Sequence, residues 1–285
     1  MPNKLSQQVV EHWVELARGQ FTTRDIWNEL DIQTSDNRAY LRVILGRLCD
    51  TGVITRTAKD GIYRRIDTDR IEMDWQAADP SKILPVRFPF GIEEHVKLYP
   101  KSVVIVTAAK NQGKSAFAYN TIKLNMDEFK IDLFNSETGS EQLKERFMPL
   151  GIPSPAPFKV YERYDNFADV IDPNAFTIID YMDTGSEVYQ VGEEIDAVFR
   201  KTNCVVFICL QKPPFVERDL AYGGGFTAKR AALYISMGNN KLKLVYVKTP
   251  AKKGVNPDNM TWTYKIGDDG VTFENIQRYY GDKEG

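Results

Sequence analysis

The fold is decided by the stretch Val103-Val104-Ile105-Val106-Thr107-Ala108-Ala109-Lys110-Asn111-Gln112-Gly113-Lys114-Ser115. It begins with an apolar, β-branched run, which is typical of a buried strand. The polar loop that follows matches the phosphate-binding pattern GxxxxGK[ST], except that Ala108 stands at the first glycine, and alanine is nearly as small. A helical pattern then runs from Lys114 to Asn125. A strand, a tight loop and a helix in this order predict a nucleotide-binding site.

The chemistry of such a loop assigns a role to each residue type. Backbone amides wrap the phosphates, a lysine reaches the β- and γ-phosphates, and a hydroxyl binds Mg²⁺. Lys114 and Ser115 fit the last two roles. We therefore expect ATP to be bound by Ala108, Asn111, Gln112, Gly113, Lys114, Ser115 and Ala116.

An acidic motif further along the chain supports this site. The run Phe176-Thr177-Ile178-Ile179-Asp180 has the Walker B form, an apolar strand with an acid at its tip. An acid in this place holds the magnesium shell, often through water. Such a strand is weak evidence by itself and gains weight beside a phosphate-binding loop. We expect Ser115 and Asp180 to hold Mg²⁺.

Strand-like and helix-like runs alternate through the rest of this region. The expected strands are residues 103–107, 130–134, 158–161, 176–179 and 204–210, and helices are expected at 114–125 and 187–200. This alternation predicts an α/β fold with a mainly parallel sheet covered by helices. Repeated prolines and weak periodicity mark residues 67–89 as a linker, so the domain is expected to span residues 90–285.

Residues 1–66 show a different pattern. Amphipathic segments at 8–18, 22–30 and 36–51 predict three helices, and the runs 53–56 and 62–66 predict a hairpin that turns at Asp60-Gly61. Three helices and a hairpin resemble a winged helix-turn-helix domain. A DNA-facing surface would then use Arg38, Arg42, Arg47, Arg56, Lys59, Arg64 and Arg65. A winged helix that docks a protein, with solvated arginines, is the alternative.

A family resemblance enters with the run Leu133-Phe134-Asn135-Ser136-Glu137-Thr138-Gly139-Ser140-Glu141-Gln142-Leu143. It resembles the strand-and-glutamate segment of RecA-fold ATPases of the DnaB-like replicative helicase type. Residues 177–181 are similar to that family's Walker B run, and residues 207–211 to its strand ending in glutamine. The resemblance covers residues 90–266 and is greatest to compact phage-type members. It implies that Glu137 activates the attacking water and that Gln211 senses the γ-phosphate.

The same resemblance implies DNA contacts and a residue that acts on a neighbouring subunit. Residues 212–230 stand where RecA-like ATPases have DNA-binding loops, and an ordinary surface loop is the alternative. The basic residues of this segment are Lys212, Arg218, Lys229 and Arg230. Lys248 matches the lysine that the family supplies to the next subunit's nucleotide, while Pro250 stands where its arginine is expected. The resemblance therefore implies a homo-oligomer, either a ring or a filament.

Composition limits the other classes of protein. Apolar residues make up 42% and charged residues 27%, and the net charge is -2, so a packed protein is expected and any DNA contact must come from a local basic patch. The cysteines show no CxxC spacing and the two histidines are isolated, which gives no sign of a zinc site. No apolar run has the length of a membrane helix. We expect a cytoplasmic location.

These observations lead to one main hypothesis and two alternatives. The main hypothesis is a DNA-dependent ATPase of replication or recombination, a helicase-like motor or remodeller that couples ATP hydrolysis to single-stranded DNA. The first alternative is a DNA-binding adaptor or regulator in which slow ATP turnover controls assembly. The second is a RecA-fold enzyme acting on small molecules, which is weakened because no second substrate-binding constellation is evident.

Overall fold

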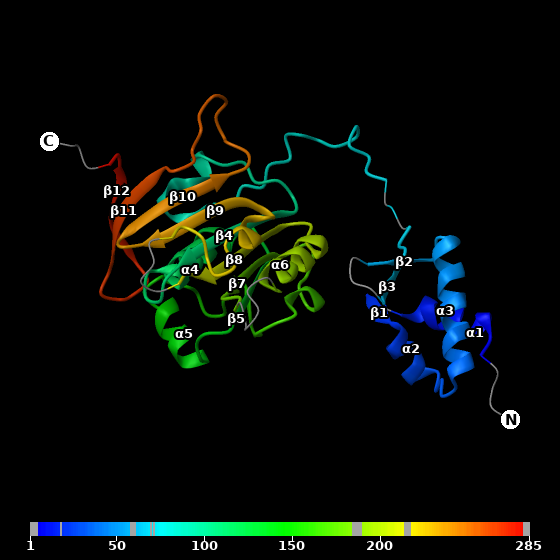
Figure 1. Cartoon of the computed structure of the whole chain (residues 1–285). Helices are drawn as coiled ribbons and strands as arrows, with labels where there is room; N and C mark the ends of the chain where they lie inside the picture. The colour runs from blue at the N-terminus through cyan, green and yellow to red at the C-terminus, as the bar shows by residue number, and fades with distance from the viewer. Residues whose placement is uncertain are drawn as a thin grey trace. The chain divides into compact units, whose positions relative to one another are not determined.

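The chain forms two compact units, residues 1–78 and 79–285 (Figure 1). The computed structural model describes residues 5–17, 19–57, 61–68, 70, 72–183, 190–213 and 218–281. No helix among these residues is long and apolar enough to cross a membrane.

The described part of unit 1 contains three helices and a three-stranded antiparallel sheet. The helices are α1 (Gln7–Leu16), α2 (Thr23–Glu29) and α3 (Ser35–Asp50). The strands are β1 (Gln20–Thr22), β2 (Ile54–Arg56) and β3 (Ile62–Arg65), in the order β1-β3-β2. The helices and the hairpin lie close to their expected positions. Strand β1 was not expected, because three residues are too few to show a period.

Local chemistry explains where α2 begins. The Thr22 hydroxyl accepts a hydrogen bond from the Asp25 amide at 3.3 Å, and the Asp25 carboxylate accepts one from the Thr22 amide at 2.6 Å. This reciprocal cap satisfies two amides that the first helical turn leaves free. The apolar side chains that face inward from the helices and strands are Val10, Val14, Phe21, Ile26, Leu41, Ile44, Leu45, Leu48 and Ile54.

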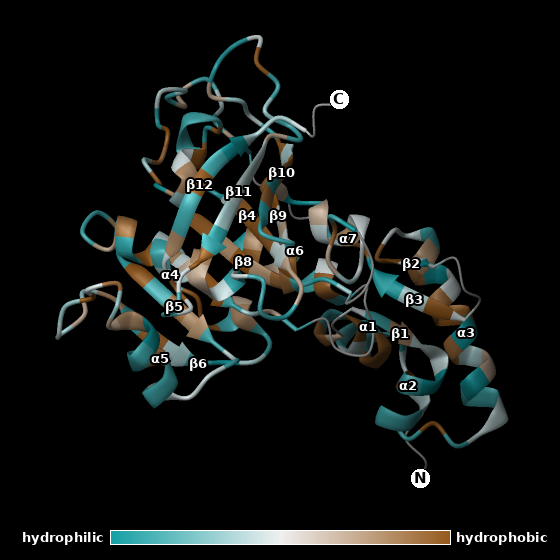
Figure 2. Cartoon of the chain, turned by 90° about the vertical axis from the view of Figure 1, so that its left-hand side faces the viewer, coloured by the Kyte–Doolittle hydropathy of each residue, from teal (hydrophilic) through white to brown (hydrophobic). Residues whose placement is uncertain are grey.

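In unit 2 the described residues build one nine-stranded sheet in the order β12-β11-β10-β9-β4-β8-β7-β5-β6. The strands are β4 (Ser102–Ala108), β5 (Ile131–Asn135), β6 (Lys159–Glu162), β7 (Phe176–Asp180), β8 (Val205–Gln211), β9 (Ala231–Gly238), β10 (Lys241–Val247), β11 (Thr261–Ile266) and β12 (Phe273–Tyr279). The part from β9 to β6 is parallel, and β9 to β12 is antiparallel. The expected mainly parallel α/β sheet is therefore confirmed. Figure 2 contrasts the apolar inner strands with the hydrophilic β12.

One short helix precedes the first strand of the parallel part, and the other helices lie between its strands. They are η1 (Pro89–Glu94), α4 (Lys114–Asn125), α5 (Ser140–Phe147), η2 (Phe167–Asp169), α6 (Gln190–Lys201) and α7 (Gly225–Ala228). The bounds of α4 are those expected from the sequence. The inner strands β4, β7 and β8 read as continuous apolar runs because they are buried on both faces.

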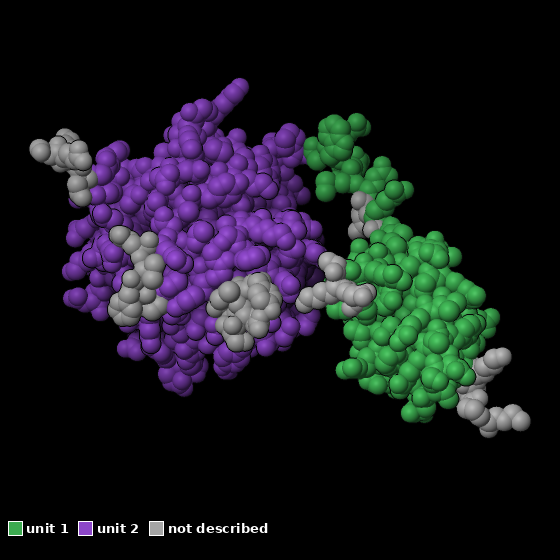
Figure 3. Space-filling model, in the orientation of Figure 1, with its two compact units in different colours: residues 1–78 green, residues 79–285 purple. Residues whose placement is uncertain are grey.

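Unit 2 begins at Asp79, ahead of the boundary expected at Phe90 (Figure 3). Val86 and Phe88 are buried in the core of this unit, so the end of the expected linker is part of the domain. The fully buried Asn125 side chain fixes this segment. It accepts a hydrogen bond from the Arg87 amide at 2.9 Å and donates one to the Arg87 carbonyl at 2.7 Å.

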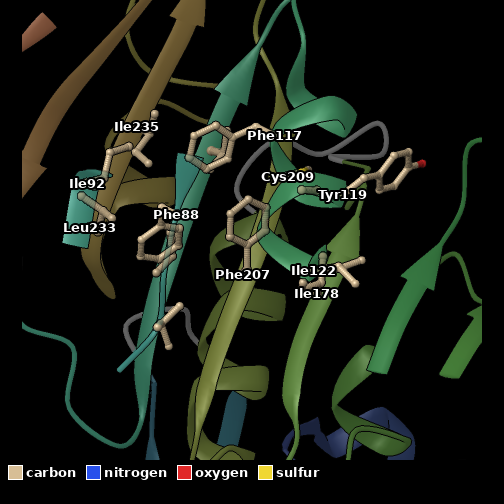
Figure 4. Close-up of a cluster of buried hydrophobic side chains, with 14 of the residues drawn as sticks. Phe88, Ile92, Phe117, Tyr119, Ile122, Ile178, Phe207, Cys209, Leu233 and Ile235 are labelled. Atoms are coloured by element: carbon tan, nitrogen blue, oxygen red, sulfur yellow. The ribbon is translucent and has the colours of Figure 1, made fainter. Parts of the chain in front are cut away.

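The two faces of the sheet have separate cores. On one face Phe117 of α4 stacks on Phe88 and Phe207, with ring centroids 6.3 Å and 6.0 Å away (Figure 4). On the other face Ile195 and Val198 of α6 are buried against β8 and β9. Truncation of a buried aromatic such as Phe117 to alanine costs about 3–5 kcal/mol of folding free energy. These cores hold α4 and the tips of the inner strands in fixed positions.

Candidate functional site

The carboxyl ends of β4, β5, β7 and β8 meet at one edge of the sheet, which is where open parallel sheets bind ligands. A pocket of about 560 Å³ lies there. It is lined by Ala109, Lys110, Asn111, Gln112, Gly113, Lys114, Ser115, Ala116, Ser136, Glu137, Arg146, Tyr181, Gln211, Ile266 and Gly270. The structure thus brings Glu137 and Gln211 to the phosphate-binding loop. Ala108 is fully buried in β4 and does not line the pocket.

Gly113 is required by the conformation and the packing of the loop. Its φ of 88° lies in the left-handed region, which favours glycine. A Cβ atom at this position would lie 3.0 Å from Ile266 Cδ1 and 3.4 Å from Met237 Cε. The loop backbone can therefore pass close to the C-terminal strands only without a side chain here.

Lys114 is held at the wall of the pocket. Its side chain is buried, and its ammonium lies 4.1 Å from the centroid of the Tyr181 ring. A cation over an aromatic face at this distance is attracted by the ring quadrupole. The ring contact thus holds the lysine at the start of α4, beside the phosphate-binding loop.

Ser115 and Glu137 approach each other across the pocket. The Ser115 hydroxyl donates a hydrogen bond to Glu137 Oε2 at 3.3 Å, and the Glu137 side chain is exposed. Asn135, the last residue of β5, fixes the turn that carries Glu137. Its amide group donates to the Thr138 carbonyl at 2.5 Å, and its Oδ1 accepts from the Thr138 hydroxyl at 3.3 Å. These hydrogen bonds therefore fix the turn that carries the Glu137 carboxylate.

Asp180 is the buried acid of the site. Both of its carboxylate oxygens lie out of contact with solvent and lack a hydrogen-bond partner among the described residues. Burial raises the pKa of this carboxyl, and the nearby Lys114 ammonium opposes the rise. An orphaned carboxylate beside a hydroxyl fits Mg²⁺, which takes one or two protein oxygens and completes its shell with phosphate and water. Ser115 and Asp180 are the residues that would hold it.

Three further residues shape the pocket and were missed by the sequence reasoning. Ser136 Oγ donates to the Tyr181 carbonyl at 2.7 Å and accepts from the Tyr181 amide at 3.0 Å, which ties the tips of β5 and β7 together. Arg146 reaches the pocket from α5. Ser136 and Tyr181 each adjoin a motif acid, and that adjacency was the available signal. No spacing rule marks Arg146.

Gln211 ends β8 beside the phosphate-binding loop. It lines the pocket, and the amide of the next residue, Lys212, donates to the Ala108 carbonyl at 2.9 Å. The Lys212 ammonium donates to Ser236 Oγ at 3.0 Å, and burial lowers its pKa. The end of β8 is therefore bonded to the end of β4, where the loop starts.

The antiparallel strands brace the phosphate-binding loop from the other side. The Tyr264 hydroxyl of β11 donates to the Gln112 carbonyl at 2.9 Å. The Gln112 side chain accepts from the Asn239 amide at 3.0 Å, in the turn between β9 and β10. Asn120 of α4 donates to the Val271 carbonyl at 2.7 Å. A C-terminal hairpin far away in sequence thus fixes the loop and its helix.

Lys248 does not belong to this pocket. It follows β10, which runs antiparallel to β9, and its amide donates to the Ala232 carbonyl near the start of β9. Strand β9 is parallel to β4, so Lys248 lies at the opposite edge of the sheet from the phosphate-binding loop. The exposed Lys248 side chain is remote from the pocket at the phosphate-binding loop of its own chain.

The basic residues after β8 lie in different surroundings. Arg218 and Lys229 are exposed. Arg230 forms an ion pair with Asp196 of α6, and its guanidinium lies 4.7 Å from the Phe199 ring centroid. Burial of Ala221 and Thr227 anchors the glycine-rich segment, and the Tyr234 hydroxyl bonds to both. Of the expected DNA contacts, Arg230 is thus turned toward the body of the domain.

The expected contacts in unit 1 are distributed over α3 and the hairpin. Arg38 is half-buried and donates to the Ile32 carbonyl at 3.2 Å. Arg42, Arg47, Arg56, Arg64 and Arg65 are exposed. Arg65 donates to the Glu15 carbonyl at 3.0 Å. Lys59 lies outside the described residues.

No family model matches the sequence, and a search of curated proteins found no match. Among solved structures, the chain is similar to the KaiC-like protein PH0186 from Pyrococcus horikoshii OT3, with 14% identity, 70% of this chain and 100% of that chain covered, and a TM-score of 0.50. The RadB recombinase matches at 13% identity over 62% of this chain and 92% of its own, with a TM-score of 0.44. A third structure, an ATPase domain, matches at 15% identity over 63% of this chain and 86% of its own, with a TM-score of 0.46. Together with the strand order and the phosphate-binding loop, the likeness to PH0186 shows a RecA-like α/β fold.

Proposed function

We propose that the chain is an ATP hydrolase of DNA metabolism in which hydrolysis is coupled to single-stranded DNA. The observation that carries the proposal is the meeting of Lys114, Ser115, Glu137 and Gln211 in one pocket, with Asp180 buried beside them. A cation for the phosphates, a metal-binding pair and an exposed carboxylate are the groups that phosphoryl transfer to water requires.

Each group has a separate role in the reaction. Lys114 binds the β- and γ-phosphates, and Glu137 accepts the proton of the attacking water. The water oxygen bonds to the γ-phosphorus, the bond to the bridging oxygen breaks, and ADP and phosphate leave. Mg²⁺, when bound, neutralises charge on the phosphate oxygens. Gln211, at the tip of β8, contacts the γ-phosphate and relays its loss to the segment that begins at Lys212.

The DNA part of the proposal rests on the family resemblance and on the architecture of unit 1. Three helices followed by a hairpin support a winged helix-turn-helix, and exposed arginines on α3 and β3 supply phosphate contacts. The activity fits a helicase-like motor or a remodeller in replication or recombination. We infer that Lys248 serves a neighbouring subunit, since it lies far from its own pocket, and that the protein forms a ring or a filament.

Steady-state ATP hydrolysis with and without DNA tests the proposal. We expect oligothymidylate to raise the rate more than duplex DNA does. Lys114→Ala should abolish hydrolysis under every condition and serves as the blank. Hydrolysis that depends on Lys114 but ignores both forms of DNA would contradict the coupling.

A slow, ATP-controlled adaptor is the second candidate. One observation favours it: Pro250 stands where the helicase family has its trans-acting arginine, and such an arginine contributes a large part of hydrolysis in trans. An adaptor would bind ATP, assemble on DNA through unit 1, and turn over slowly whether or not single strands are present. The same hydrolysis measurement separates the two candidates.

A further inference from the structure

A basic face of the sheet adjoins the nucleotide pocket. In β10 the buried Leu242 and Leu244 alternate with the half-exposed Lys241 and Lys243. This alternation is typical of an antiparallel strand with one solvated face. The two leucines pack into the core that also contains α4, so the lysines lie on the other face of the sheet.

These lysines line a groove of about 1160 Å³, which we call the basic groove. It is formed by β9 to β12, residues 212–213 and 218–219 after β8, and the phosphate-binding loop. Its cationic lining residues are Lys110, Lys212, Arg218, Lys241 and Lys243. Among the described residues that line it, Asp219 is the one acid, and it pairs with Lys243 at 2.8 Å. The groove therefore has a positive excess in a chain whose net charge is -2.

We propose that the basic groove binds the phosphate backbone of single-stranded nucleic acid. This inference rests on the proposed function and names the surface that its substrate occupies. Tyr279 lines the groove, and the Lys241 ammonium lies 4.0 Å from the centroid of its ring. A cationic groove with an aromatic side chain suits a single strand, because lysine binds phosphate while the ring stacks on a base.

The basic groove and the nucleotide pocket share a wall. Ala109, Lys110 and Gln112 line both. Gln112 is bonded to the turn after β9 and to β11, and Lys212 directly follows Gln211. A nucleic-acid strand bound in the groove would thus contact the phosphate-binding loop and the residue next to Gln211. These shared and adjacent residues would couple ATP hydrolysis to the bound nucleic acid.

The basic groove contains a different set of basic residues from the one predicted to contact DNA. Lys212 and Arg218 line it, whereas the Arg230 side chain is occupied by Asp196. Lys110 of the phosphate-binding motif joins them, together with Lys241, Lys243 and Tyr279, which were not predicted as DNA contacts. Sheet pairing brings them together from segments that are distant in sequence.

Fluorescence anisotropy of labelled oligothymidylate with the full chain tests the groove. Lys241→Glu should weaken binding about tenfold or more and reduce the salt dependence, because each lost phosphate contact lowers the slope by about 0.7. Tyr279→Ala should weaken binding about tenfold, while Tyr279→Phe should bind like the parent. Lys201→Glu, at the end of α6 and away from the groove, is the matched charge reversal and should also bind like the parent.

Binding of a fluorescent ATP analogue and the melting temperature show whether each variant is folded. Where Lys241→Glu fails this check, Lys241→Gln replaces it. If the folded Lys241 variants and Tyr279→Ala bind oligothymidylate like the parent, the proposal that the basic groove binds nucleic acid is overturned. The proposed DNA-dependent ATPase activity would then still stand. A parent protein that hydrolyses ATP but never binds oligothymidylate would overturn both.

Discussion

Substitution of Asp180 should raise the free energy of unfolding and abolish ATP hydrolysis. Its carboxyl is fully buried, and burial raises its pKa. A group whose pKa is higher in the folded than in the unfolded protein contributes stability that is fully present below its unfolded pKa, about 3.9 for Asp. That stability is lost as the pH rises through the folded pKa. Above the unfolded pKa, burial of this carboxyl therefore lowers the free energy of unfolding relative to its value in acid. Asp180→Asn removes that cost and should also remove Mg²⁺-dependent hydrolysis.

Thermal unfolding without nucleotide measures the first effect. We expect Asp180→Asn to melt about 2–4 °C higher for each kcal/mol gained. The gain should shrink as the pH falls toward the unfolded pKa, because the parent carboxyl then becomes protonated. A lower melting temperature for Asp180→Asn at neutral pH would show that the ionised carboxylate stabilises the fold instead.

Tyr181 should lower the affinity of the pocket for ATP by holding the Lys114 ammonium. The contact between the ammonium and the ring, at 4.1 Å, competes with phosphate for the same cation. Such contacts contribute about 0.5–1 kcal/mol where they are not fully desolvated, so Tyr181→Leu should bind ATP about two- to fivefold more tightly. Tyr181→Phe keeps the ring and should bind like the parent. Titration with a fluorescent ATP analogue checks both; weaker binding by Tyr181→Leu would mean that the ring holds the nucleotide.

Among the elements, the hairpin of β11 and β12 should matter to the phosphate-binding loop. The Tyr264 hydroxyl is the hydrogen-bond donor to the Gln112 carbonyl, and the ring is buried. Tyr264→Phe leaves that carbonyl without this partner, which costs about 1–3 kcal/mol and loosens the loop. We expect a lower melting temperature and weaker ATP binding. Tyr246→Phe, on the exposed side of β10, is the control and should change neither.

The sequence predicted the elements that carry strong local signals. Helix α4 was predicted with its observed bounds, because a glycine precedes it and its pattern is continuous. Strands β9 and β12 were not placed, since their sheet order depends on pairing between distant segments. The same limit applies to the site. Lys114, Ser115 and Glu137 lie in motifs, whereas Arg146 reaches the pocket through the packing of α5.

For the whole molecule, the position of Lys248 leads to a test of assembly. A chain with Lys114→Ala still offers Lys248, and a chain with Lys248→Ala still has an intact pocket. If subunits share sites, each variant alone should hydrolyse ATP poorly, and their mixture should recover activity above the sum of the two. Steady-state hydrolysis of mixtures at constant total protein measures this. Parent-like activity of Lys248→Ala alone would exclude a role for Lys248 in trans.

The central claim is that the ends of β4, β5, β7 and β8 form one site for ATP hydrolysis, with Glu137 as the base. The most direct measurement is the rate of ATP hydrolysis by Glu137→Gln with saturating oligothymidylate, next to its affinity for a fluorescent ATP analogue. We predict a rate reduced about 100-fold or more, because general bases contribute about 10²–10⁴-fold, and an affinity close to that of the parent. A Glu137→Gln protein that binds ATP and hydrolyses it at the parent rate would contradict the claim.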